Sequence, residues 1–217
     1  MLTPLHEHVT RSLGNLVGSW LLSLRERRNG SKEVSEAARS IFIHGSADIS
    51  LKGIGIRQAH NSYRHLQSKF PELVVEIAWS EPVSDLRESA EAFIEETSGG
   101  VRTVIRLNLT EVYEARKRNE TGDAKLSIWR AKFDSSGRYS GIEKNEDRVY
   151  QNRAGRAIGS TTLEISFQVF LSEQIGDKLA KNNPKLKISA KQLSEMFKEG
   201  LAALQEPADE ETESDES

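Results

Sequence analysis

The spacing of apolar residues predicts a long amphipathic helix over residues 3–28, where such residues recur every three or four positions from Leu5 to Leu24. The polar sequence NGS at 29–31 ends this helix. The segment KEVSEAARS that follows has the composition of a second, shorter helix. The N-terminal part of the chain is therefore expected to be helical.

Strand-forming residues follow. The sequences IFIHG at 41–45 and ADISLKG at 47–53 predict two short strands with a tight connection. Residues 54–69 are polar and basic, which favours a loop with a helical turn. The apolar run LVVEIAW then predicts a strand over 72–80 that is buried on both faces.

A helix over 84–97 and a strand over 101–110 come next. A strand, a helix and a strand in this order predict two parallel strands of one sheet, joined by the helix. The helix ends at the sequence SGG, which is typical of a helix C-terminus.

The second half of the chain is less regular. The sequence EARKRNETGDAK predicts a polar loop, and DSSGR predicts a turn. Strands are expected at 126–133 and 161–171, and a closing amphipathic helix at 189–205. The complete order predicts an α/β fold of the mixed α+β kind, with one domain over 1–205 built on a central sheet.

Composition adds to this picture at the C-terminus. Residues 206–217 contain seven acidic residues and no basic one, which predicts a disordered acidic tail. The whole chain has a net charge of −3, but without this tail 26 acidic residues oppose 30 basic ones, for +4. A mildly basic body permits contact with nucleic acid without arguing for it.

The chain has no cysteine, which excludes disulfides, thiolate metal sites and cysteine catalysis. This absence fits a reducing compartment, so we expect an intracellular protein of the cytoplasm or nucleus. No apolar run approaches the ~20 residues that span a bilayer, so no membrane association is expected.

One residue stands out against the apolar pattern. Glu76 lies in the middle of the predicted strand 72–80, where an unpaired carboxylate would cost several kcal/mol. It can be paired with a buried arginine, it can sit at a strand end, or it can bind a metal. If the strand that carries Asp48 pairs with this one, both carboxylates can share a hard cation such as Mg²⁺ or Mn²⁺. Such an ion can activate water for phosphodiester hydrolysis.

The order helix, three strands, helix, strand, with an aspartate on the second strand and a glutamate on the third, resembles the PD-(D/E)XK nucleases, the restriction-endonuclease-like superfamily. More narrowly, GSADISL, FPELVVEIAWSEPVSDLRESAEAFIEE, GGVRTVIRLNL and KLSIWRAKF resemble blocks of a fungal PD-(D/E)XK nuclease-like family. The resemblance covers about residues 40–133. It implies a restriction-endonuclease-like core, DNA as partner, and Asp48 and Glu76 as metal ligands for Mg²⁺ or Mn²⁺.

The chain departs from this family at its catalytic lysine. The position two residues after Glu76 is Ala78, and the aspartate block reads Ala47-Asp48 without the family's proline. Lys52, four residues after Asp48 on the same predicted strand, is the candidate for a relocated catalytic lysine, or else it points to solvent at a strand end. Arg87 can hold a phosphate but not act as a base. Glu81 is a candidate third carboxylate, and Glu7 corresponds to a helical carboxylate of some superfamily members.

Two functions follow from the resemblance. The first is a metal-dependent nuclease that hydrolyses DNA phosphodiesters with Asp48, Glu76 and Lys52. The second is a catalytically inactive nuclease-fold module that binds nucleic acid or a protein. His60 and His65 match no zinc spacing, so we expect them to be ordinary surface histidines.

Overall fold

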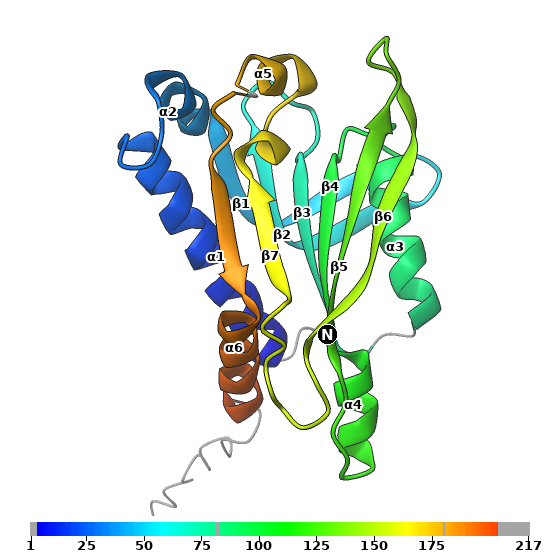
Figure 1. Ribbon diagram of the computed structural model, residues 1–217. Coiled ribbons are helices and arrows are strands. Elements are labelled where there is room, and N and C mark those ends of the chain that lie inside the picture. Colours follow the sequence, from blue (N-terminus) through cyan, green and yellow to red (C-terminus); the bar gives the residue numbers. More distant parts are fainter. Residues whose placement is uncertain (1–3, 81–82, 180, 204–217) are drawn as a thin grey trace, which may run out of the picture.

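A six-stranded sheet forms the centre of the protein (Figure 1). The computed structural model describes residues 4–80, 83–179 and 181–203, and the predicted tail at 206–217 lies outside them. The strands follow one another across the sheet in chain order: β1 (Ile41–Leu51), β2 (Gly55–His65), β3 (Leu73–Ala78), β4 (Thr103–Asn108), β5 (Ala124–Phe133) and β6 (Tyr139–Gln151). Neighbouring strands are antiparallel except for β3 and β4, so the protein has a mixed α+β fold.

The parallel pair confirms the strand–helix–strand prediction. The helix α3 (Val83–Glu95) joins β3 to β4, whose residues pair in parallel from Leu73–Thr103 to Ala78–Asn108. Every residue of β3 is buried, because helices or other strands cover both faces of the sheet at this point.

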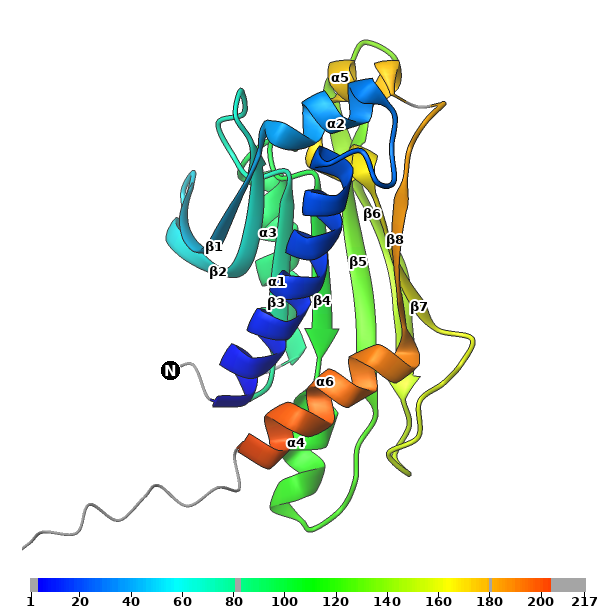
Figure 2. The same ribbon diagram turned by 90° about the vertical axis from the view of Figure 1, so that its left-hand side faces the viewer.

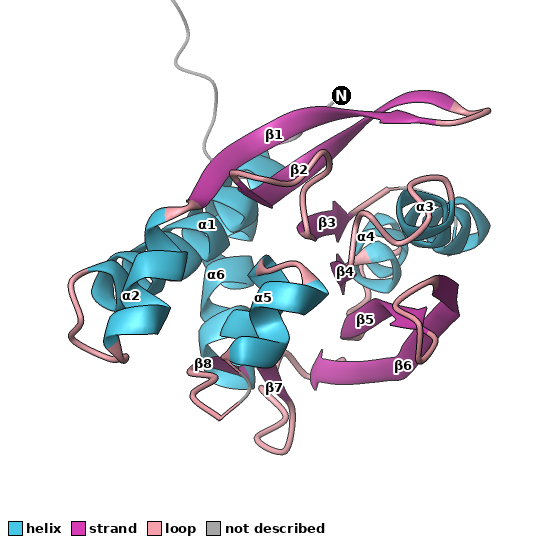
Figure 3. Cartoon of the chain, turned by 90° about the horizontal axis from the view of Figure 1, so that it is seen from above, coloured by secondary structure: helices cyan, strands magenta, loops and turns pink. Residues whose placement is uncertain are grey.

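The elements outside the sheet cover its two faces unequally (Figures 2 and 3). Seen from above, α3 lies on one side of β3–β5, while α1 and α6 lie on the other. A large apolar core joins α1, α6 and a second, two-stranded sheet to one face, and a smaller core lies under α3. The remaining elements are α1 (Pro4–Arg25), α2 (Lys32–Arg39), α4 (Thr110–Lys117), β7 (Thr162–Ser166), the 3₁₀ helix Phe167–Phe170, α5 (Glu173–Lys178), β8 (Lys185–Ser189) and α6 (Ala190–Ala203).

The predictions for 41–69 were wrong. Residues 41–51 form one long strand rather than two short ones, and the predicted loop at 54–69 is mostly β2. The polar residues of β2 conceal its alternation, and pairing with β1 supplies the backbone hydrogen bonds that local preference did not predict. In the same way, part of the polar loop predicted from Glu114 onward belongs to α4.

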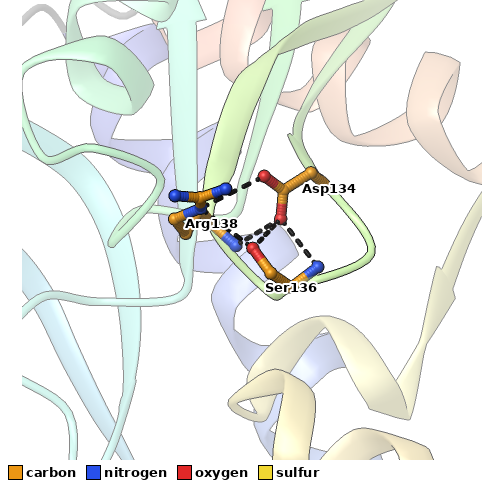
Figure 4. Close-up of polar contacts among 3 residues, drawn as sticks. All are labelled: Asp134, Ser136 and Arg138. Atoms are coloured by element: carbon orange, nitrogen blue, oxygen red, sulfur yellow. Dashed lines mark hydrogen bonds and ion pairs between the residues drawn. The ribbon is translucent and has the colours of Figure 1, made fainter.

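The predicted turn DSSGR does connect two strands, β5 and β6 (Figure 4). Asp134 Oδ1 accepts hydrogen bonds from the backbone N–H groups of Ser136 and Arg138 and from the Ser136 hydroxyl. These bonds, the one from the Ser136 hydroxyl above all, favour the charged form and lower the pKa of Asp134. The side chain therefore closes the loop locally, as Asp often does in turns.

None of the helices in the described ranges combines the length with the apolar character that crossing a bilayer requires.

Candidate functional site

Glu76 is buried because the protein provides partners for its carboxylate. The residue is 7% exposed on β3, and its Oε1 accepts the backbone N–H of His60 at 3.3 Å. The same oxygen lies 3.5 Å from His60 Nδ1. Arg106 pairs with Glu76 in the β3–β4 register, so the two side chains leave the same face of the sheet. The sequence alone allowed either a buried arginine or a metal beside Glu76. The structure provides a backbone hydrogen bond from His60 and the buried Arg106 as a neighbour.

The structure does not bring Asp48 and Glu76 together. Asp48 is on β1 and Glu76 on β3, and β2 lies between these strands. Ile49 and Val74 pack in the same apolar core under α3. Alternation of side chains along a strand then places Glu76 on this face and the exposed Asp48 on the other face. The two carboxylates point away from one another, contrary to the expectation of a shared cation.

Lys52 is also placed differently from the prediction. β1 ends at Leu51, and Lys52 lies exposed in the turn that leads into β2. It therefore does not share a strand face with Asp48. Glu81 lies outside the described residues, as does the side chain of Arg87.

A divalent metal does not fit the described side chains. Across residues 4–80, 83–179 and 181–203, no group of three or more His, Asp or Glu side chains is arranged to hold a metal ion. The position of the usual lysine is the fully buried Ala78. Mg²⁺ requires several oxygen ligands in a near-octahedral arrangement, and Glu76 alone does not provide them.

Two irregularities in the β1–β2 hairpin determine what lies beside Glu76. β1 has one residue more than β2 between Ile43 and Gly45, and β2 has one residue more than β1 between Ala59 and Ser62. Gly45 takes a φ of 62°, which its lack of a side chain permits. Such bulges redirect side chains from one face of a sheet to the other.

The bulge in β2 brings two polar side chains to the helix α1. Ala59 packs in the core under α3, whereas Asn61 is hydrogen-bonded from Nδ2 to the backbone oxygen of Thr10, at 3.3 Å. His60, between them, stacks on His6 of α1 with ring centroids 5.3 Å apart. The bulge therefore presents His60 and Asn61 to α1, which no sequence period indicates.

The two histidine rings form part of a buried cluster. Burial lowers the pKa of His6 to about 4, and the neighbouring His60 adds to this shift. The backbone N–H of Ile77 donates to His60 Nδ1 at 3.3 Å. Because Nδ1 accepts this bond, the ring proton of neutral His60 is assigned to Nε2. Because its pKa is about 4, His6 is a neutral imidazole at physiological pH.

A cavity of about 600 Å³ lies between α1 and the β1–β2 hairpin, beside this cluster. Figure 3 shows α1 running alongside these two strands. One wall is a stripe of α1 from Glu7 to Leu22, and the other consists of Ile43, Gly45, Ser46, His60 and Asn61. This volume is within the usual range for sites that bind small molecules.

Two residues that line the cavity carry buried polar atoms without a hydrogen-bond partner among the described residues. Asn61 is only 5% exposed, and its Oδ1 has no hydrogen-bond partner among the described residues. The carbonyl of Thr10 can only accept a hydrogen bond, so Asn61 Nδ2 must face it and Oδ1 must face elsewhere. The buried hydroxyl of Thr10 is also unpaired. Because buried polar atoms are nearly always satisfied, these two point to a ligand or ordered water.

Sequence reasoning missed this site. His60 and His65 were expected on the surface, yet the His60 side chain is 12% exposed and His65 is 4% exposed. The sequence did contain one signal, a stripe along one face of α1. The stripe begins with the charged Glu7 and Arg11, continues through small residues that include Gly18, and ends at the apolar Leu22. The opposite wall includes the bulged strand β2, which the sequence did not predict to be a strand.

Comparisons of the chain with protein-family models, curated proteins and solved structures find no match.

Proposed function

We propose that this chain is a catalytically inactive relative of the PD-(D/E)XK nucleases, which acts by binding a protein partner rather than by hydrolysing DNA. The observation that carries the proposal is the placement of Asp48 and Glu76 on opposite faces of the sheet with β2 between them. Two carboxylates so placed do not hold one cation.

The order of elements supports a nuclease-like core. A helix, three antiparallel strands, a helix and a parallel strand occur in α1–β1–β2–β3–α3–β4, with α2 inserted before the first strand. We propose that this part corresponds to the restriction-endonuclease-like core. Besides the missing lysine at Ala78, it departs from the superfamily pattern in the position of Asp48, which lies on the first strand and not on the second.

The exposed surface supports a protein partner over nucleic acid. Among the described residues, the large exposed apolar side chains lie at the two ends of the β1–β2 hairpin. Phe42, Ile43 and Leu66 lie at the open end, with Leu22 of α1 beside Ile43 in the cavity wall, and Ile54 and Ile56 lie at the tip. The exposed apolar side chains at the open end, next to the cavity, are typical of a protein interaction site. Nucleic-acid sites instead combine basic residues with stacking aromatics.

The second candidate is a metal-dependent nuclease that hydrolyses DNA phosphodiesters. The order of elements and the glutamate on the third strand favour it. This candidate requires Mg²⁺ or Mn²⁺ to recruit ligands that the described residues do not bring together.

Three measurements on the full chain test the proposal: cleavage of supercoiled plasmid with Mg²⁺ or Mn²⁺, calorimetry with Mn²⁺, and DNA binding by fluorescence anisotropy. The matched variants are Glu76→Gln and, as a control on the exposed face of α6, Glu195→Gln. We expect no cleavage, no saturable heat from Mn²⁺ and no DNA binding at physiological salt.

Cleavage by the wild type and the Glu195→Gln control, lost in Glu76→Gln, would overturn the proposal and establish the nuclease. DNA binding without cleavage, weakening steeply with added salt, would overturn the protein partner in favour of a nucleic-acid module.

A further inference from the structure

The cavity beside α1 has one polar end and one apolar end. Glu7, Thr10 and Arg11 lie toward the N-terminus of the helix, opposite Asn61. A helix places residues three and four apart on the same side, so the lining of this wall continues along α1 away from Glu7.

The apolar end lies further along the same stripe. Gly18 faces Ile43, because a Cβ added to this glycine would lie 3.4 Å from Ile43 Cδ1. Leu22 follows one turn later, and both Leu22 and Ile43 are about half exposed. The bare glycine leaves room that a larger residue on α1 would fill.

The charges at the polar end are of opposite sign and unpaired. Glu7 and Arg11 lie one helical turn apart, and neither forms an ion pair within the described residues. Two further residues of the cavity wall, Asn61 and Thr10, carry buried polar atoms, Oδ1 and Oγ1, that have no hydrogen-bond partner among the described residues. Oδ1 can only accept a hydrogen bond, so the ligand atom that meets it must be a donor.

We propose that this cavity binds a small zwitterion with an apolar tail, of the size of an amino acid or dipeptide. The ligand's ammonium group donates to Asn61 Oδ1 and is balanced by Glu7, and its carboxylate is bound by Arg11. The tail extends over Gly18 toward the apolar end.

This arrangement satisfies each feature of the cavity. An ammonium group supplies the donors that the buried oxygen atoms lack, and a carboxylate matches the planar fork of a guanidinium. The volume of about 600 Å³ admits an amino acid with a branched side chain and leaves room for a second residue. The binding is independent of hydrolysis, since it uses none of Asp48, Lys52 or Glu76.

Calorimetry on the full chain tests the proposal with four probes: L-leucine, L-leucyl-L-leucine, 3-methylbutylamine without the carboxylate, and 4-methylpentanoate without the ammonium group. We expect saturable binding of leucine or its dipeptide, and at least tenfold weaker binding of both singly charged analogues. Arg11→Met should lower the affinity for leucine to the affinity for 3-methylbutylamine. Lys191→Met, an exposed lysine on α6, is the matched control and should change nothing.

A second variant tests the location. Gly18→Leu fills the apolar end from a helical position that accepts leucine, so circular dichroism should show an intact fold while leucine binding falls at least tenfold. Absence of saturable binding of any probe by the folded wild type overturns the ligand class. Equal affinity for all four probes overturns the zwitterion, and undiminished binding by Gly18→Leu overturns the location. None of these results depends on the cleavage assay, so failure here is distinct from failure of the proposed function.

Discussion

At the scale of single residues, Glu76 illustrates how a buried charge is accommodated. Its carboxylate is hydrogen-bonded by the backbone of His60, and Arg106 lies beside it in the sheet. Removing one member of such a group leaves the others buried without compensation, which is more costly than the group's net contribution to stability. A buried acid in an apolar strand therefore does not by itself indicate a metal.

Two glycines of α1 provide a matched pair. Gly18→Ala should raise the free energy of unfolding by about 0.5–1 kcal/mol, because alanine favours the helix and its Cβ meets only Ile43 at 3.4 Å. Gly14→Ala should give no gain, or a loss, since its Cβ would lie 2.6 Å from Asn61 Nδ2 and displace the bond from Asn61 to Thr10. Urea unfolding of the two variants measures the difference. Equal stabilisation by both would show that Asn61 moves aside without cost.

The buried His6 predicts a dependence of stability on pH. Its pKa in the folded protein, about 4, lies below the 6.5 of an exposed histidine, so the unfolded chain binds more protons between these values. The contribution of neutral His6 is fully present above pH 6.5 and is lost as the pH falls toward 4. The stability advantage of the wild type over His6→Gln should shrink by roughly 3 kcal/mol across this window. His60 and Glu76, which face His6, are kept in both proteins. An advantage that stays constant with pH would contradict the low pKa.

At the scale of elements, the C-terminus of α3 requires a particular residue, Gly99. α3 ends at Glu95, and the Gly99 N–H donates back to the carbonyl of Ile94 at 2.8 Å. Gly99 has a φ of 76°, and an added Cβ would lie 2.9 Å from Tyr139 and 3.0 Å from Phe133. This glycine is required both for its backbone conformation and for the space it leaves to the β5–β6 hairpin.

Gly99→Ala should therefore lower the free energy of unfolding by about 2–3 kcal/mol, from strain in the left-handed region and from overpacking. The matched control is Gly159→Ala, where an added Cβ meets nothing within 4 Å. Thermal unfolding of both variants tests the difference. An equally large loss of stability in Gly159→Ala would show that replacing a glycine has this effect whatever its conformation and surroundings.

At the scale of the whole molecule, the cores on the two faces of the sheet share strands β3–β5. β3 and β4 are buried almost throughout and β5 mainly from Ala124 to Trp129, whereas Lys52, Gly53 and Ile54 at the tip of the β1–β2 hairpin are exposed. Local opening is least costly where few buried contacts are lost.

Hydrogen exchange should follow this division. We expect backbone amides of β3, β4 and β5 to exchange only through global unfolding, and those at 52–55 to exchange within seconds to minutes. Mass spectrometry with peptic fragments resolves the two regions. Comparable protection of the hairpin tip would indicate that a second chain covers it in solution.

The sequence by itself determined the elements whose apolar periods are strong. The helices α1, α3 and α6 were predicted because each buries a regular face that local spacing reveals. The parallel strands β3 and β4 were predicted because each is a short apolar run that is buried on both faces. The mixed α+β class follows from their order. The nuclease resemblance, the intracellular location and DNA as a partner stay predictions.

Only the tertiary structure decided the surroundings of the candidate site. β2 forms because β1 provides its hydrogen bonds, and its interposition separates Asp48 from Glu76. The bulge at His60 and Asn61 reverses the direction of side chains that a period of two would assign. The unpaired oxygen of Asn61 becomes significant only where α1 and β2 meet. Periodicity records which face of an element is apolar, but strand neighbours, bulges and cavities depend on contacts between residues distant in the chain.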